Sequence, residues 1–128
     1  MSTKLFQDKG SLSKLDISGN RICGLNEYGN GTYDASGLAA LAKSIGNLKE
    51  LNISNNFLKS EGAKVLVPAL EANGPLSKLT FSGDDYYSKP VTVEVGMTEA
   101  DFSGAALQSS GAMILAAWLK HKVQHDLD

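Results

Sequence analysis

Apolar and polar residues follow one spacing that returns several times along the chain. Segment 12–22 reads LxxLxIxxNxI, and segment 48–58 reads LxxLxIxxNxL. A third start over 76–84 reads LxxLxFxxD, and a degenerate fourth over 97–107 reads MxxAxFxxAxL. Self-similarity of this kind is typical of repeat architectures. The sequence therefore predicts four repeats, which start near 12, 48, 76 and 97.

Within each repeat, the apolar residues first recur at every second position and then at positions three and four apart. Alternation with a period of two predicts strands, and apolar residues three and four apart predict a following helix. One such unit cannot bury its apolar face alone, so successive units must stack. We expect a parallel sheet in sequential order, with helices on the other side. The strands are predicted near 14–18, 50–54, 78–82 and 99–103, and the helices near 37–45, 62–72 and 111–121.

The repeats are unequal in length. Their starts are separated by 36, 28 and 21 residues. The long first repeat carries an insertion over 23–36, CGLNEYGNGTYDAS. The short third repeat has PVTVEV at 90–95 where a helix is expected, and its β-branched residues predict an extended segment on the convex side.

Almost the whole chain resembles the ribonuclease-inhibitor-like class of leucine-rich repeats. The features that carry the resemblance are the LxxLxLxxNxL segments, the glycine that follows them and the AxxLAxAL-type helix. The resemblance implies an α/β leucine-rich-repeat solenoid, a right-handed β-α superhelix with a parallel sheet on the concave side and helices on the convex side. It implies one domain over 1–128. It also implies that Asn20 and Asn56 bond buried loop backbone. Ribonuclease inhibitors are rich in cysteine and this chain has one, so their particular function does not carry over.

The two ends of the chain look incomplete as a repeat array. Segment 4–11, KLFQDKGS, aligns with 68–75, PALEANGP, so residues 1–11 resemble the tail of a preceding repeat. The chain stops where a fifth repeat would begin, and neither end has a clear polar cap of the kind that repeat arrays need. We expect a fragment or an element completed by association. An uncovered strand at 99–103 would favour self-association.

Composition and charge exclude several classes of function. The 128 residues are 42% hydrophobic and carry 12 basic and 14 acidic side chains, for a net charge of −2. This balance favours neither nucleic acid nor an anionic membrane. One cysteine and an N-terminus without an apolar run indicate a cytoplasmic protein. The longest apolar stretch, 111–119, is shorter than the ~20 residues of a membrane span.

Catalytic and metal-binding residues are not evident. Cys23 could act as a nucleophile only with His121 or His125 as its base, but the repeats place them at opposite ends of the stack. Asp84 and Asp85 are two adjacent acids, whereas calcium requires several spaced oxygens. We therefore expect no enzyme activity, no metal and no cofactor.

Polar side chains on the outward positions of the strands form sets in register. Lys14, Glu50, Lys78 and Glu99 alternate in charge across neighbouring strands. The next set is Asp16, Asn52, Thr80 and Asp101. These sets either fix the strand register or bind a partner. Four strands offer roughly 350 Å², which is less than the ~800 Å² that each partner buries in a standard interface.

All four tyrosines and the lone arginine follow strands on the loop side. Tyrosine is common at interfaces, although these rings could equally cover the edge of the core. We expect a non-catalytic module that binds a protein; the alternatives are a regulator of an enzyme such as a small GTPase, or a structural segment of a longer scaffold. The predicted binding face consists of Asp16, Arg21, Tyr28, Tyr33, Asn52, Thr80, Asp84, Asp85, Tyr86, Tyr87 and Asp101.

Overall fold

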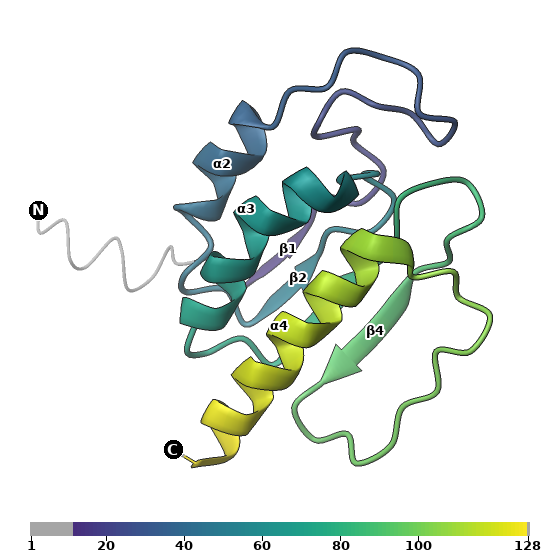
Figure 1. Cartoon of the computed structure of the whole chain (residues 1–128). Helices are drawn as coiled ribbons and strands as arrows, with labels where there is room; N and C mark the ends of the chain where they lie inside the picture. The colour runs from purple at the N-terminus through teal and green to yellow at the C-terminus, as the bar shows by residue number, and fades with distance from the viewer. Residues whose placement is uncertain (1–11, 128) are drawn as a thin grey trace, which may run out of the picture.

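In the part of the chain that the structure describes, a four-stranded sheet forms one layer and three helices cover one of its faces (Figure 1). The structure is a computed structural model that describes residues 12–127. The comparison of residues 1–11 with the tail of a preceding repeat therefore lies outside the described residues. The strands are β1 (Lys14–Asp16), β2 (Glu50–Asn52), β3 (Lys78–Phe81) and β4 (Val91–Glu94), and the helices are α2 (Ser36–Ala42), α3 (Lys59–Ala72) and α4 (Gln108–Leu127).

The first three strands are parallel and lie in chain order, as the spacing predicts. The leucine of each strand occupies the same register position, with Leu15 beside Leu51 and Leu51 beside Leu79. These side chains face the helices, and Leu51 and Leu79 are buried. Their neighbours along each strand point away from the helices because successive strand residues alternate between the two faces.

The prediction of a fourth parallel strand at 99–103 is wrong. The strand beside β3 is β4, and it runs antiparallel, with Leu79 opposite Val93 and Thr80 opposite Thr92. The alternating β-branched residues of this segment favour a strand, and the short connection over 82–90 returns the chain beside β3. The segment expected on the convex side therefore lies in the sheet, which is mixed.

The fourth repeat keeps its turn although it contributes no strand. Asp101 Oδ1 accepts a hydrogen bond from the backbone N–H of Ser103, as Asp16 does from Ser18. Gly104 and Ala106 have positive φ, as Gly19 and Arg21 do in the first repeat. The edges of the sheet are β1 and β4, so the expected exposed strand at 99–103 is not an edge. Self-association stays a prediction.

The helices supply the other half of the core. α3 packs lengthwise against α4, and α2 lies on the far side of α3 (Figure 1). Leu66 and Leu70 of α3 and Ile114 of α4 are almost fully buried against the sheet. Trp118 is also buried. Its ring lies 5.2 Å from that of His121.

Buried side-chain amides connect the repeats at both ends of the strands. Asn56 accepts hydrogen bonds from the backbone N–H groups of Asn20 and Ile22 and donates to the carbonyl of Ile17. At the opposite end, Asn73 donates to the carbonyls of Ile45 and Leu48. Buried carbonyl and N–H groups need such partners. The implied role of Asn56 in satisfying loop backbone is therefore confirmed.

Candidate functional site: the open face of the sheet and the tyrosine rim

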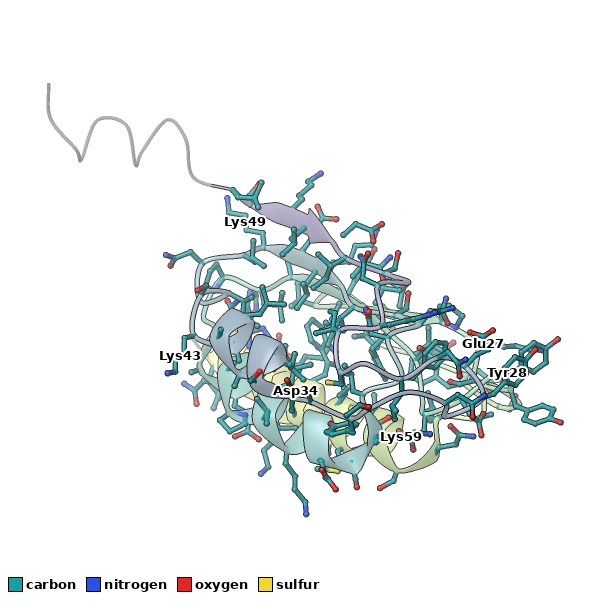
Figure 2. All side chains as sticks on the ribbon, turned by 90° about the horizontal axis from the view of Figure 1, so that it is seen from above. Glu27, Tyr28, Asp34, Lys43, Lys49 and Lys59 are labelled. Atoms are coloured by element: carbon teal, nitrogen blue, oxygen red, sulfur yellow. The ribbon has the colours of Figure 1, made fainter. Side chains whose placement is uncertain are left out.

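Three tyrosines from two loops meet at one end of the molecule. The rings of Tyr28 and Tyr86 are stacked, with centroids 5.8 Å apart and planes inclined by 16°. Tyr87 packs against Tyr86 edge to face at 5.6 Å. The three rings are 63–74% exposed, and Figure 2 shows Glu27 and Tyr28 at the tip, away from the body of the protein. We call these three residues the tyrosine rim.

A backbone hydrogen bond joins the two loops. The N–H of Tyr86 donates to the carbonyl oxygen of Glu27 at 2.9 Å. Tyr28 lies in the insertion of the first repeat, while Tyr86 lies in the connection between β3 and β4. Repeat stacking therefore brings together two segments that are far apart in sequence.

The insertion holds Tyr28 through a compact turn centred on Asn26. Asn26 Oδ1 accepts hydrogen bonds from the backbone N–H groups of Tyr28 and Asn30. An isolated bridge pairs Leu25 with Gly31 below this turn. The backbones approach closely there, because a Cβ on Gly31 would collide with the carbonyl of Gly24. The glycine at 31 thus permits the pairing that positions Tyr28.

The second loop is anchored by the first residue of α4. Gln108 Oε1 accepts a hydrogen bond from the N–H of Asp84 at 2.5 Å, and its Nε2 donates to Asp85 Oδ1 at 2.8 Å. Asp85 Oδ1 also accepts from the N–H of Tyr87 at 3.0 Å. Lys59 Nζ donates to the carbonyl of Asp84 at 2.9 Å. The backbone of Asp84 and the carboxylate of Asp85 therefore hold the loop that carries Tyr86 and Tyr87.

The expectation that all four tyrosines lie together is wrong for Tyr33. Its ring packs against the core, and its hydroxyl donates a 2.7 Å hydrogen bond to the carbonyl of Leu58. Burial, together with the nearby Cys23 thiol, raises the pKa of Tyr33. Burial likewise raises the pKa of Cys23. Tyr33 thus covers the core, which was the alternative interpretation of these rings.

The face of the sheet that the helices do not cover, here called the open face, presents Asp16, Asn52 and Thr80 on adjacent strands. The strand beside Thr80 supplies Thr92, and the two hydroxyl oxygens lie 2.8 Å apart. Asp101 is therefore not the fourth member of this row, because residues 99–103 do not join the sheet. Hydrogen bonds from Ser18 lower the pKa of Asp16, and those from Ser103 lower the pKa of Asp101.

Alternating charges cross the same face. Lys14 Nζ lies 3.0 Å from the Glu50 carboxylate, and Lys78 Nζ lies 3.9 Å from it. Lys78 Nζ also lies 3.7 Å from Glu94. The alternation at the first three positions is as predicted, but Glu94 occupies the fourth position in place of Glu99. A shallow cavity of about 330 Å³ covers this row and the one beside it.

Arg21 is exposed in the turn after β1, with φ of +50°. It does not line the hollow beside the tyrosine rim, which is formed by Glu27, Tyr28, Asp85, Tyr86 and Tyr87. Sequence reasoning missed Glu27, although it precedes a predicted site residue. It also missed Gln108, Thr92 and Glu94, for which the repeat pattern contains no signal.

The residues considered for catalysis lie apart from this face. Cys23 is buried, and His121 Nε2 lies 2.6 Å from the carbonyl oxygen of Leu76. Within residues 12–127, no three His, Cys, Asp or Glu side chains form a group that could hold a metal ion. Over the same residues, no helix is long and apolar enough to cross a membrane.

Comparison with models of known protein families gives a match for one segment of the chain. Residues 47–68, which contain β2 and most of α3, match the family model described as Leucine Rich Repeat. Comparison with curated proteins gives no match, and comparison with solved structures gives none either. The match supports a leucine-rich repeat in this chain, and such a repeat suggests a module for protein interaction.

Proposed function

We propose that the chain is a non-catalytic protein-interaction module that binds its partner through the tyrosine rim and the adjoining open face. The observation that carries the proposal is the stacking of Tyr28 on Tyr86 in solvent. Large aromatic rings are normally buried, and an exposed group of them is typical of a binding surface. A tyrosine provides apolar area together with a polar tip, which suits an interface that is wet before binding.

The required area favours a surface larger than the sheet. The sheet alone supplies roughly 350 Å², whereas a specific partner buries about 800 Å² on each side. The two loops that meet at Tyr86 would add aromatic area to that of the sheet, which presents Asp16, Asn52 and Thr80. Insertions in repeat proteins often lie on the binding side, and the insertion of the first repeat carries Tyr28.

The arrangement of nucleophiles and bases supports a role without catalysis. Cys23 is buried and its pKa is raised by that burial, which disfavours the reactive thiolate. His121 Nε2 is in contact with the carbonyl of Leu76, so this nitrogen is occupied by backbone. These contacts support the proposal that neither group acts on a molecule bound at the tyrosine rim.

We further propose that the repeats are of the ribonuclease-inhibitor-like class. α2, α3 and α4 back the strands, as in that class, and the buried amide of Asn56 joins consecutive turns. The antiparallel β4 is a departure from it.

The proposal is tested by affinity capture from an extract of the source cells, with quantitative mass spectrometry. Three baits are compared: the wild-type chain, the variant Tyr86→Ala/Tyr87→Ala, and a convex-side control, Lys64→Ala. Lys64 is exposed on α3, so its variant keeps the fold and leaves the tyrosine rim intact. We expect a protein retained by the wild type and the control to be lost with the tyrosine variant.

Equal retention by all three baits would reject the tyrosine rim as the binding site. A purified partner then allows the affinity to be measured by calorimetry with the same variants. Turnover of the partner's own substrate, measured with and without this chain, separates simple binding from regulation of an enzyme.

A further inference from the structure

We infer that the hollow beside the tyrosine rim receives a cationic side chain of the partner, specifically an arginine guanidinium. The inference rests on the proposed function and names the chemistry that the partner must present. The hollow has a volume of about 230 Å³. It is lined by the three residues of the tyrosine rim together with two acidic residues, Glu27 and Asp85.

The rings supply a surface that attracts cations. The face of an aromatic ring carries partial negative charge, so a cation within about 6 Å of its centre is stabilised. Tyr28 and Tyr86 are stacked at 5.8 Å, which is less than the roughly 7 Å that an inserted planar group needs for contact on both sides. Tyr86 and Tyr87 are inclined by 85°. A guanidinium would therefore rest in the corner beside these two rings.

The two carboxylates give the hollow a negative charge. None of the five residues that line it is basic, so nothing in the lining neutralises Glu27 and Asp85. Asp85 Oδ1 is held by the N–H of Tyr87 and by Gln108 Nε2. A carboxylate fixed in this way is oriented before the partner arrives, which lowers the entropy lost on binding.

The combination favours arginine over lysine. A guanidinium is planar, so it can stack on a ring while its N–H groups donate to carboxylates in the same plane. A lysine ammonium is compact and strongly hydrated, and it satisfies one of these requirements at a time. An apolar side chain would leave both carboxylates desolvated without a partner, which is costly.

The test is an NMR titration of the labelled chain with N-acetyl-arginine methylamide. N-acetyl-citrulline methylamide is the matched control because it has nearly the same shape without the charge. We expect saturable shifts of the amide signals of residues 27–28 and 85–87 with the arginine probe, and an apparent affinity about threefold or more weaker with citrulline. Equal response to both probes, or arginine shifts confined to the acids of the open face, would overturn the inference.

Variants separate the rings from the charges. Tyr87→Phe keeps the ring face and should bind the arginine probe nearly as the wild type does, whereas Tyr87→Leu should bind about threefold more weakly. Glu27→Gln should weaken binding and reduce its dependence on salt. Glu99→Gln removes an exposed acid outside the hollow and should change nothing. Unchanged binding by both Tyr87→Leu and Glu27→Gln would reject the site.

The outcomes distinguish this inference from the proposed function. If the tyrosine variant loses the captured protein but arginine and citrulline act alike, the interaction face stands and the arginine pocket falls. If the arginine probe binds in the hollow but no captured protein depends on the tyrosine rim, the pocket stands and the proposed function falls.

Discussion

The side chain of Asn56 reaches into the preceding repeat, where its Oδ1 accepts a 2.9 Å hydrogen bond from the backbone N–H of Asn20. Asn56 is 1% exposed, and it also contacts the backbone of Ile17, Ile22 and Ile53. Asn20 occupies the matching position of the first repeat but is exposed, and its side-chain amide donates to the carbonyls of Ile17 and Ser18. Although Asn20 and Asn56 occupy equivalent positions of the repeat, we expect Asn56 to contribute more to the free energy of unfolding.

Replacing Asn56 by Ala should destabilise the fold strongly. Several buried backbone groups lose their partner at once, and each unsatisfied group costs about 1–3 kcal/mol. We expect a loss of about 3 kcal/mol for Asn56→Ala and about 1 kcal/mol for Asn20→Ala, measured by urea denaturation. Equal losses would mean that the buried amide does not join the repeats as described.

Gly83 is required for the close approach of two chain segments. A Cβ there would lie 2.6 Å from the carbonyl oxygen of Ala106 and would also collide with that of Leu107. Both atoms are backbone, so relief requires the fourth turn to move. Gly83→Ala should cost about 2 kcal/mol. Gly74→Ala, where a Cβ meets no atom within 4 Å, is the control for urea denaturation and should be nearly neutral.

Charge reversals on the open face test whether Glu94 or Glu99 occupies the fourth position of the row of alternating charges. Glu50 lies between Lys14 and Lys78, so Glu50→Lys would place three lysines side by side. We expect a loss of about 1 kcal/mol at low salt that shrinks in roughly 1 M salt. Glu94→Lys should act in the same direction, while Glu99→Lys leaves the melting temperature unchanged. A larger effect of Glu99→Lys would mean that residues 99–103, and not β4, form the fourth strand of the sheet.

Stability should fall at alkaline pH because of Cys23. Burial raises the folded-state pKa of this thiol above its ordinary value of 9.0, so the unfolded chain loses the proton first. The contribution is complete below that value and is lost as the pH rises through the folded pKa. The raised pKa of Tyr33 extends the decline. Denaturation with reductant present should show a flatter decline above about pH 9 for Cys23→Ala than for the wild type.

Truncation of Tyr33 should lower the stability of the fold, whereas truncation of Tyr87 should weaken partner binding. Tyr33→Ala removes core packing and the bond to Leu58, and should cost about 3 kcal/mol of folding free energy. Tyr87→Ala should change stability by less than about 0.5 kcal/mol but weaken partner binding by about 2 kcal/mol if the ring is a hot spot. Parallel losses of stability and binding for Tyr87 would assign it to core cover as well.

The sequence by itself determined the repeats and the elements that follow directly from them. The strands around Leu15, Leu51 and Leu79 and the helices behind them depend on spacing within a single repeat, while the role of Asn56 was implied by the resemblance to a repeat class. Such spacing is visible because a strand alternates every second residue and a helix returns every third or fourth. Gly83 and Gly19 occupy matching positions, but Gly83 permits a close backbone approach whereas Gly19 adopts a positive φ.

Only the tertiary structure decided how segments outside this pattern meet. The segment at β4 competes with the fourth repeat for the edge of β3, and its antiparallel pairing places Glu94 beside Lys78 and Thr92 beside Thr80. The meeting of Tyr28 with Tyr86, and the turn of Tyr33 into the core, depend on the paths of two irregular loops. Those paths follow from long-range hydrogen bonds such as Tyr86 to Glu27. Periodicity along the chain contains no information about such contacts.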